Sequence, residues 1–157
     1  MSRLQDATSA RVLVVDDHDA ARESVADVLR CAGYHVETAA SAVEALPRME
    51  AARSAGASFD VVVTDLQMPG INGLEFIREI NQRRLNVQAI MVTAYATINS
   101  AVEAMRFGAF DYLEKPFDVT ALEQLVARAV QRGGISRQDE ALGLPATDAA
   151  CLGMVGT

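Results

Sequence analysis

Several polar side chains stand directly after short apolar runs in this sequence. Asp16 and Asp17 follow one run, Asp65 follows a second, Thr93 ends a third, and Lys115 comes just after a fourth. A carboxylate can attack a phosphoryl group and form an acyl phosphate. A hydroxyl and an ammonium group can bind the transferred oxygens. These residue types predict phosphoryl-transfer chemistry, provided that the fold brings them together.

The segments around these residues alternate between two patterns. Short apolar runs predict five strands, at 11–16, 34–39, 59–65, 87–93 and 110–114. The first run is continuous, which suits a strand buried on both faces of a parallel sheet. Apolar residues at helical spacing predict a helix after each strand. Five such pairs predict an α/β, flavodoxin-like fold, with a doubly wound five-stranded parallel sheet in the order 2-1-3-4-5 and five helices.

Two of the predicted helices contain residues that disfavour a helix. Ser41 and Glu44 form a capping-box pattern, but Pro47 then falls inside the helix and costs about 3 kcal/mol. We expect a kink there, or a short and loosely held helix. Gly133 and Gly134 are expected to end the last helix.

Length and composition fit one globular domain. The chain has 157 residues, half of them apolar, which is enough for one sizeable core. We expect this domain at 11–132, a disordered N-terminus at 1–10, and a linker or disordered tail at 133–157. A formal net charge of −7 argues against direct binding of nucleic acid or an anionic membrane by this chain.

The sequence predicts a cytoplasmic protein. Its first residues contain no apolar run typical of a signal peptide, and no stretch of 18 apolar residues could span a membrane. The two cysteines, Cys31 and Cys151, have no metal-type spacing and fit a reducing compartment. Cys31 is expected to be buried in its helix.

Strand ends define where the chemistry is expected. In a parallel α/β sheet, ligands bind outside the carboxyl ends of the strands, so Asp16, Asp17 and Asp65 should converge with Lys115. Three carboxylates repel one another, and Mg²⁺ is a cation that prefers such oxygen ligands. His18 beside the acid pair is interpreted as an exposed loop residue. The sequence therefore predicts a Mg²⁺ site formed by the three aspartates.

Four segments resemble, in order and spacing, the receiver domain of bacterial two-component response regulators. They are VLVVDD (12–17), VVVTDLQMPGINGLEF (61–76), MVTAY (91–95) and GAFDYLEKPF (108–117). The resemblance implies a signalling domain that accepts a phosphoryl group from a sensor histidine kinase. It implies no enzyme activity beyond self-catalysed phosphotransfer and dephosphorylation.

The resemblance also implies roles for single residues. Asp65 would be the phosphoacceptor, and the backbone carbonyl of Gln67 would be a further Mg²⁺ ligand. Lys115 would bind the phosphoryl group, and the peptide bond that follows it is commonly cis in the family. Thr93 and Tyr112 would form a switch pair. On phosphorylation they would reorient and change the surface formed by the fourth helix, the fifth strand and the fifth helix.

The type of regulator is suggested by two stretches. Residues 92–118 resemble receivers of nitrogen-regulator-class activators, which work with the sigma-54 form of RNA polymerase. LGMVGT (152–157) resembles the lead-in to their ATPase domain. We expect a homodimer, with output ATPase and DNA-binding domains outside this chain, which would then be part of a longer protein. A receiver with another output, or one standing alone, is the alternative.

A magnesium-dependent phosphatase is the main competing interpretation. Haloacid-dehalogenase-type enzymes carry their nucleophile in a D-x-D motif after the first strand, whereas here the acid pair comes first and position 67 is not acidic. They also need a cap, for which this chain has no room. A flavin-binding protein of the same fold would need a phosphate-binding loop after the first strand, where the sequence DDHDAA is acidic.

Overall fold

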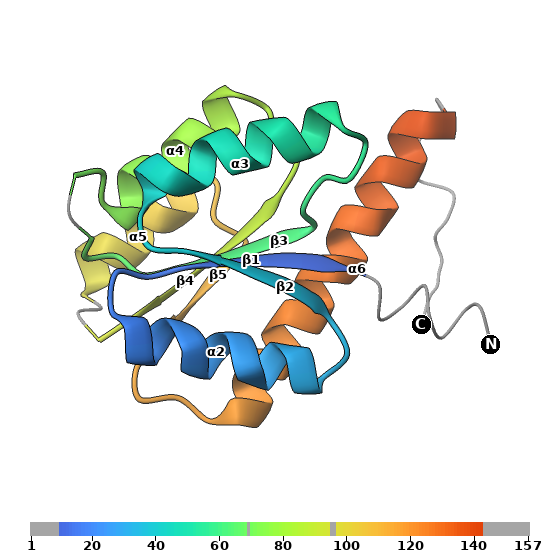
Figure 1. The fold of residues 1–157 in the computed structure, drawn as a ribbon. Helices are drawn as coiled ribbons and strands as arrows, with labels where there is room; N and C mark the ends of the chain where they lie inside the picture. The colour runs from blue at the N-terminus through green and yellow to red at the C-terminus, as the bar shows by residue number, and fades with distance from the viewer. Residues whose placement is uncertain (1–9, 69, 95–96, 143–157) are drawn as a thin grey trace.

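The computed structural model describes residues 10–68, 70–94 and 97–142. Strands and helices alternate along this part of the chain (Figure 1). The elements are β1 (Arg11–Val15), α2 (Asp19–Cys31), β2 (His35–Ala39), α3 (Ala42–Ser54), β3 (Val61–Thr64), α4 (Gly73–Gln82), β4 (Gln88–Thr93), α5 (Ile98–Arg106), β5 (Asp111–Glu114) and α6 (Val119–Leu142).

The strands form one parallel sheet in the order β2-β1-β3-β4-β5. Helices α2 and α6 pack on one face of the sheet, and α3, α4 and α5 pack on the other (Figure 1). Both the strand order and the five helices confirm the predicted flavodoxin-like fold. This topology places the ends of β1, β3, β4 and β5 beside one another.

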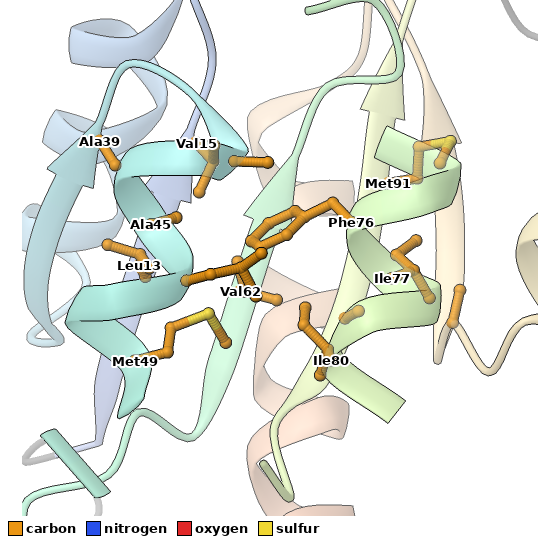
Figure 2. Packing of buried hydrophobic residues seen from close by; sticks show 14 of the residues in the cluster. Leu13, Val15, Ala39, Ala45, Met49, Val62, Phe76, Ile77, Ile80 and Met91 are labelled. Carbon is orange, nitrogen blue, oxygen red and sulfur yellow. The ribbon is translucent and has the colours of Figure 1, made fainter. Parts of the chain in front are cut away.

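Burial on both faces fixes the central strands. Leu13 and Val15 of β1 belong to the core cluster under α3, α4 and α5. The alternate residues of β1 belong to a second cluster, under α2 and α6. Figure 2 shows part of the first cluster, in which Phe76 extends from α4 toward Val62 of β3. The strand ends that carry the polar residues therefore project from a rigid, close-packed support.

Helix α3 is better held than its proline suggests. It runs for 13 residues through Pro47, and its own residues Ala45, Leu46 and Met49 are buried against the core. Its first turn is capped, because the Ser41 side chain accepts a hydrogen bond from the backbone N–H of Glu44. The alternative of a short, loosely held helix is therefore wrong, since cap and core packing outweigh the hydrogen bond that proline removes. The alternative of a kink at Pro47 stays a prediction.

Helix α6 is longer than expected. It continues through Gly133 and Gly134 and ends at Leu142, so the predicted helix end is wrong. Each glycine costs a helix only about 1 kcal/mol, which a helix already packed on the sheet through Leu122 and Val126 can tolerate. Of the ends expected at 1–10 and 133–157, residues 1–9 and 143–157 lie outside the described residues. Ala10, expected to be disordered, is buried and belongs to the folded domain.

Two further findings concern Cys31 and the helices of the described residues. Cys31 is exposed, so the expectation that it is buried is wrong. It lies at the last position of α2, where the helix leaves the core. Within the part of the chain that the structure describes, no helix is long and apolar enough to cross a membrane.

Candidate functional site

Backbone hydrogen bonds between neighbouring strands hold the polar residues at the sheet edge. The N–H of Asp65 donates to the carbonyl of Val15 at 3.1 Å, and the N–H of Lys115 donates to the carbonyl of Thr93 at 2.9 Å. The N–H of Asp16 donates in the same way to the last residue of β2, at 3.2 Å. The ladder thus continues one step past the strands and fixes each functional residue relative to its neighbour.

The side chains of Asp16, Asp65 and Lys115 come together at this edge, as the strand pattern predicted. Lys115 Nζ lies 3.3 Å from Asp16 Oδ2 and 3.6 Å from Asp65 Oδ2. Both carboxylates are buried, with 5% and 6% of the residue exposed. Burying a charge without a partner is costly, so the single ammonium group offsets the two most buried acids of the site.

Asp17 is the third carboxylate, and one of its oxygens lacks a hydrogen bond. Its Oδ1 atom is buried and accepts no hydrogen bond from any described residue. Ligand atoms of Asp16, Asp17, His18 and Asp65 all lie within 4.8 Å of one another. An oxygen-rich cluster with an unsatisfied buried oxygen fits a divalent cation with oxygen ligands, of the Mg²⁺ type.

The loop after β1 is held by interactions that start at Asp16. Asp16 Oδ1 accepts a hydrogen bond from the backbone N–H of His18 at 3.0 Å. The Arg22 guanidinium donates to the carbonyl of Asp16 at 2.9 Å and to Asp19 Oδ1 at 2.6 Å. The role of Arg22 was not predicted from the sequence. Its spacing of three from Asp19 was a visible signal, but such pairs are common on helix surfaces.

The loop after β3 closes tightly on Asp65. Asp65 Oδ1 accepts a hydrogen bond from the backbone N–H of Leu66 at 2.7 Å, and the carbonyl of Leu66 accepts one from Gly73 at 2.8 Å. A Cβ atom on Gly73 would collide with the Asp65 carbonyl oxygen and lie 2.9 Å from Leu66 Cα. Gly73 is therefore needed for this close approach. The sequence analysis missed it, because only tertiary packing brings the two segments together.

The predicted switch residues lie on one face of neighbouring strands. Thr93 ends β4 and is fully buried. Tyr112 of β5 stands opposite Met91, two residues before Thr93, and packs half-buried against the cluster under α3, α4 and α5. Residues two apart on a strand share a face, so Thr93 and Tyr112 both point toward the side of the sheet that α5 covers.

The remaining predicted site features are distributed as follows. Gln67 is exposed in the loop after β3. The peptide bond between Lys115 and Pro116 is cis, as the family resemblance implied. His18 is exposed, as expected, with 71% of its side chain accessible. Tyr95, the last residue of the segment MVTAY that carries the resemblance, lies outside the described residues.

Fold and site together define a class of protein, and comparison with known families names it. The family model for the response regulator receiver domain matches residues 12–127. The chain therefore belongs to the response regulator receiver domain family.

The relatives of the chain are bacterial regulators. It is 40% identical over 139 residues to the transcriptional regulatory protein FixJ of Azorhizobium caulinodans, covering 85% of this chain and 61% of that protein. It is 42% identical over 120 residues to the response regulator protein FleR of Pseudomonas aeruginosa, covering 76% and 24%. The DNA-binding transcriptional regulator NtrC of Escherichia coli is 37% identical over 119 residues, again with 76% and 24% covered. The chain thus spans less than two thirds of these relatives.

Solved structures give the same picture. The crystal structure of FixJ-N superposes with a TM-score of 0.71 at 33% identity, covering 78% of this chain and 94% of that one. The solution structure of the beryllofluoride-activated NtrC4 receiver domain dimer superposes with a TM-score of 0.71 at 32% identity, covering 78% and 98%.

Proposed function

We propose that this receiver domain accepts a phosphoryl group on Asp65 from a phosphohistidine of a sensor kinase. The N–P bond of the donor breaks as a bond forms between phosphorus and a carboxylate oxygen of Asp65, and the imidazole of the kinase leaves. The observation that carries this proposal is the position of Asp65 at the central strand end, buried, with Lys115 Nζ 3.6 Å from its Oδ2. The ammonium group can bind the phosphoryl oxygens as they arrive. Thr93 at the next strand end is proposed to bind another of them through its hydroxyl.

The same proposal assigns a metal to the acid cluster. Asp16, Asp17 and Asp65 would hold Mg²⁺ with the backbone carbonyl of Gln67. A bound Mg²⁺ screens the charge of a phosphoryl anion that approaches a carboxylate. The buried Oδ1 of Asp17, which accepts no hydrogen bond from a described residue and lies 3.2 Å from His18 Nδ1, supports this assignment.

We propose that the phosphorylated domain signals through α5, β5 and α6. Thr93 would turn toward the phosphoryl group and Tyr112 would move into the space that it leaves. Helix α5 is suited to move, because Ala104 is its one buried residue among those described. Its outer face exposes a row of apolar side chains at helical spacing: Ile98, Val102 and Met105. Such a row fits a contact with a second copy of the chain, and the NtrC4 receiver relative is described as a dimer.

The output of the switch is proposed to be transcription. The relatives are named as transcriptional or response regulators, and the matched NtrC and AtoC proteins of Escherichia coli support a nitrogen-regulator-class activator. ATPase and DNA-binding domains outside this chain would then carry the output. FixJ supports the alternative of a different output domain, because the receiver covers 61% of FixJ and 24% of NtrC. The only reactions that the domain would catalyse are the phosphorylation and dephosphorylation of its own Asp65.

A cytoplasmic location belongs to the same proposal. The exposed thiol of Cys31 persists in a reducing compartment, and the sensor kinase must present its phosphohistidine in the same compartment as this domain. The net charge of −7 argues against direct binding of nucleic acid by this chain.

Intact-mass spectrometry after incubation with Mg²⁺ and a small acyl phosphate tests the proposal. We expect one phosphoryl adduct per chain, which an excess of chelator prevents. Asp65→Asn should abolish the adduct. Asp60 is an acid just before the first residue of β3, at the end opposite Asp65, and Asp60→Asn should keep the adduct. An adduct that survives in Asp65→Asn would refute the proposal.

A further inference from the structure

Strand β2 lies at one edge of the sheet, and among the described residues its only neighbouring strand is β1 (Figure 1). The N–H of His35 donates to the residue before β1, and the carbonyl of Ala39 accepts from the residue after it. Because alternate residues of a strand direct their backbone groups to the same side, Val36 and Thr38 direct theirs away from the sheet. Such outward groups on an edge strand are a template for pairing with a strand of another chain.

Two arginines bind the outward carbonyls of β2. Arg30 of α2 donates through Nη2 to the carbonyl of Val36 at 3.3 Å. Arg48 of α3 donates through Nη1 to the carbonyl of Thr38 at 2.6 Å. Since α2 and α3 pack on opposite faces of the sheet, the two side chains reach the edge from both sides. They are 45% and 42% exposed, so they occupy the surface on which an added strand would have to lie.

Acidic residues one turn away on the same helices hold both guanidinium groups. Arg48 Nη2 donates to Glu44 Oε2 at 3.1 Å, and Arg30 Nη1 lies 3.5 Å from Asp27 Oδ1. A guanidinium group has five N–H donors in a fixed plane, so each can bind its carboxylate and its carbonyl at the same time. A strand that paired with β2 would have to displace both arginines from the carbonyls.

We propose that Arg30 and Arg48 close the β2 edge against the same strand of a second copy of this chain. The edge would otherwise favour such pairing, because the outward residues, Val36 and Thr38, are of the β-branched type that strands prefer. With this edge closed, copies of the domain can associate only through other surfaces, such as the exposed row on α5. The inference concerns self-association before phosphorylation and does not depend on the chemistry of Asp65.

Sedimentation velocity of the double variant Arg30→Ala/Arg48→Ala tests the proposal, without an acyl phosphate and over a range of concentrations. We expect the double variant to associate at about tenfold lower concentration than the parent chain, as one or two freed hydrogen bonds would allow. Loss of two cations makes an already acidic chain more negative, which by itself opposes association. Hydrogen exchange should show the backbone amides of residues 36 and 38 protected in the associated form.

Arg53→Ala is the matched control. Arg53 is also 42% exposed and also donates to two carbonyls, those of Arg83 and Arg84, but these lie in a loop after α4 and not on an edge strand. This variant should sediment as the parent chain does. The single variant Arg48→Ala, which frees one carbonyl, should show a smaller effect than the double variant, and it carries the test if the double variant unfolds.

A proline locates the association at β2. Thr38→Pro removes an outward N–H that pairing with β1 does not use, and proline is tolerated at such a position of an edge strand. Added to the double variant, it should restore the sedimentation of the parent chain. The proposal would be overturned if the arginine variants sedimented as Arg53→Ala does. It would also be overturned if they associated while the amides at 36 and 38 stayed unprotected.

Discussion

Among single residues, Gly73 is the one whose replacement by any larger residue should disturb the site most directly. Its Cβ position is occupied by the backbone of Asp65 and Leu66, so Gly73→Ala must push the phosphoacceptor loop away from the strand end. We expect it to destabilise the fold by roughly 1–3 kcal/mol. We also expect about tenfold more Mg²⁺ to be needed for half-maximal phosphorylation. Thermal unfolding and the Mg²⁺ dependence of the mass adduct measure the two effects.

A control separates positioning from general damage. Gly56→Ala places its Cβ where no atom lies within 4 Å, although the residue has a positive φ of 78°. It should cost stability without changing the Mg²⁺ dependence. If Gly73→Ala only lowered the unfolding temperature and left the Mg²⁺ dependence unchanged, Gly73 would have no role in positioning Asp65.

Among the helices, α3 contains a residue, Pro47, that lowers the stability of the domain. Pro47 is exposed on α3 and removes one hydrogen bond to the preceding turn. Pro47→Ala should therefore stabilise the domain by about 1–3 kcal/mol, measured by denaturant unfolding. Val43→Ala, an exposed substitution on the same helix, should shift stability by less than about 0.5 kcal/mol. If Pro47→Ala left the free energy of unfolding unchanged or lowered it, Pro47 would not destabilise the domain, and the prediction would be wrong.

The elements also show how far the sequence could be interpreted. Short apolar runs located every strand to within two residues at either end. The signal was clearest for β1, β3 and β4, because strands buried on both faces must be continuously apolar. Pro47 and the glycine pair at 133–134 misled the helix predictions, since core packing and helix propagation outweighed local propensity. Strand ends predicted the convergence of Asp65 and Lys115. Gly73 was missed because its contact with Asp65 forms only in the folded chain. Arg22 was missed because its spacing of three from Asp19 is common on helix surfaces.

For the whole domain, the exposed row on α5 predicts how the switch is transmitted. Ile98 is 83% exposed, so Ile98→Glu should leave the unfolding temperature unchanged. If a second copy covers this row after phosphorylation, the variant should stay monomeric under conditions where the parent chain dimerises. Sedimentation velocity with and without an acyl phosphate measures this. Val43→Glu, on the distant helix α3, is the matched control and should dimerise normally. Equal dimerisation of both variants would exclude α5 as the interface.

The central claim is that the domain carries its signal as an acyl phosphate on Asp65. Borohydride reduces an acyl phosphate of aspartate to homoserine and leaves a free carboxylate unchanged. After phosphorylation with Mg²⁺ and a small acyl phosphate, reduction followed by peptide mass spectrometry should place homoserine at position 65. Asp16, Asp17 and the other acids should remain aspartate or glutamate. Homoserine at another position, or a phosphoryl group that resists reduction while Asp65 stays unmodified, would contradict the account.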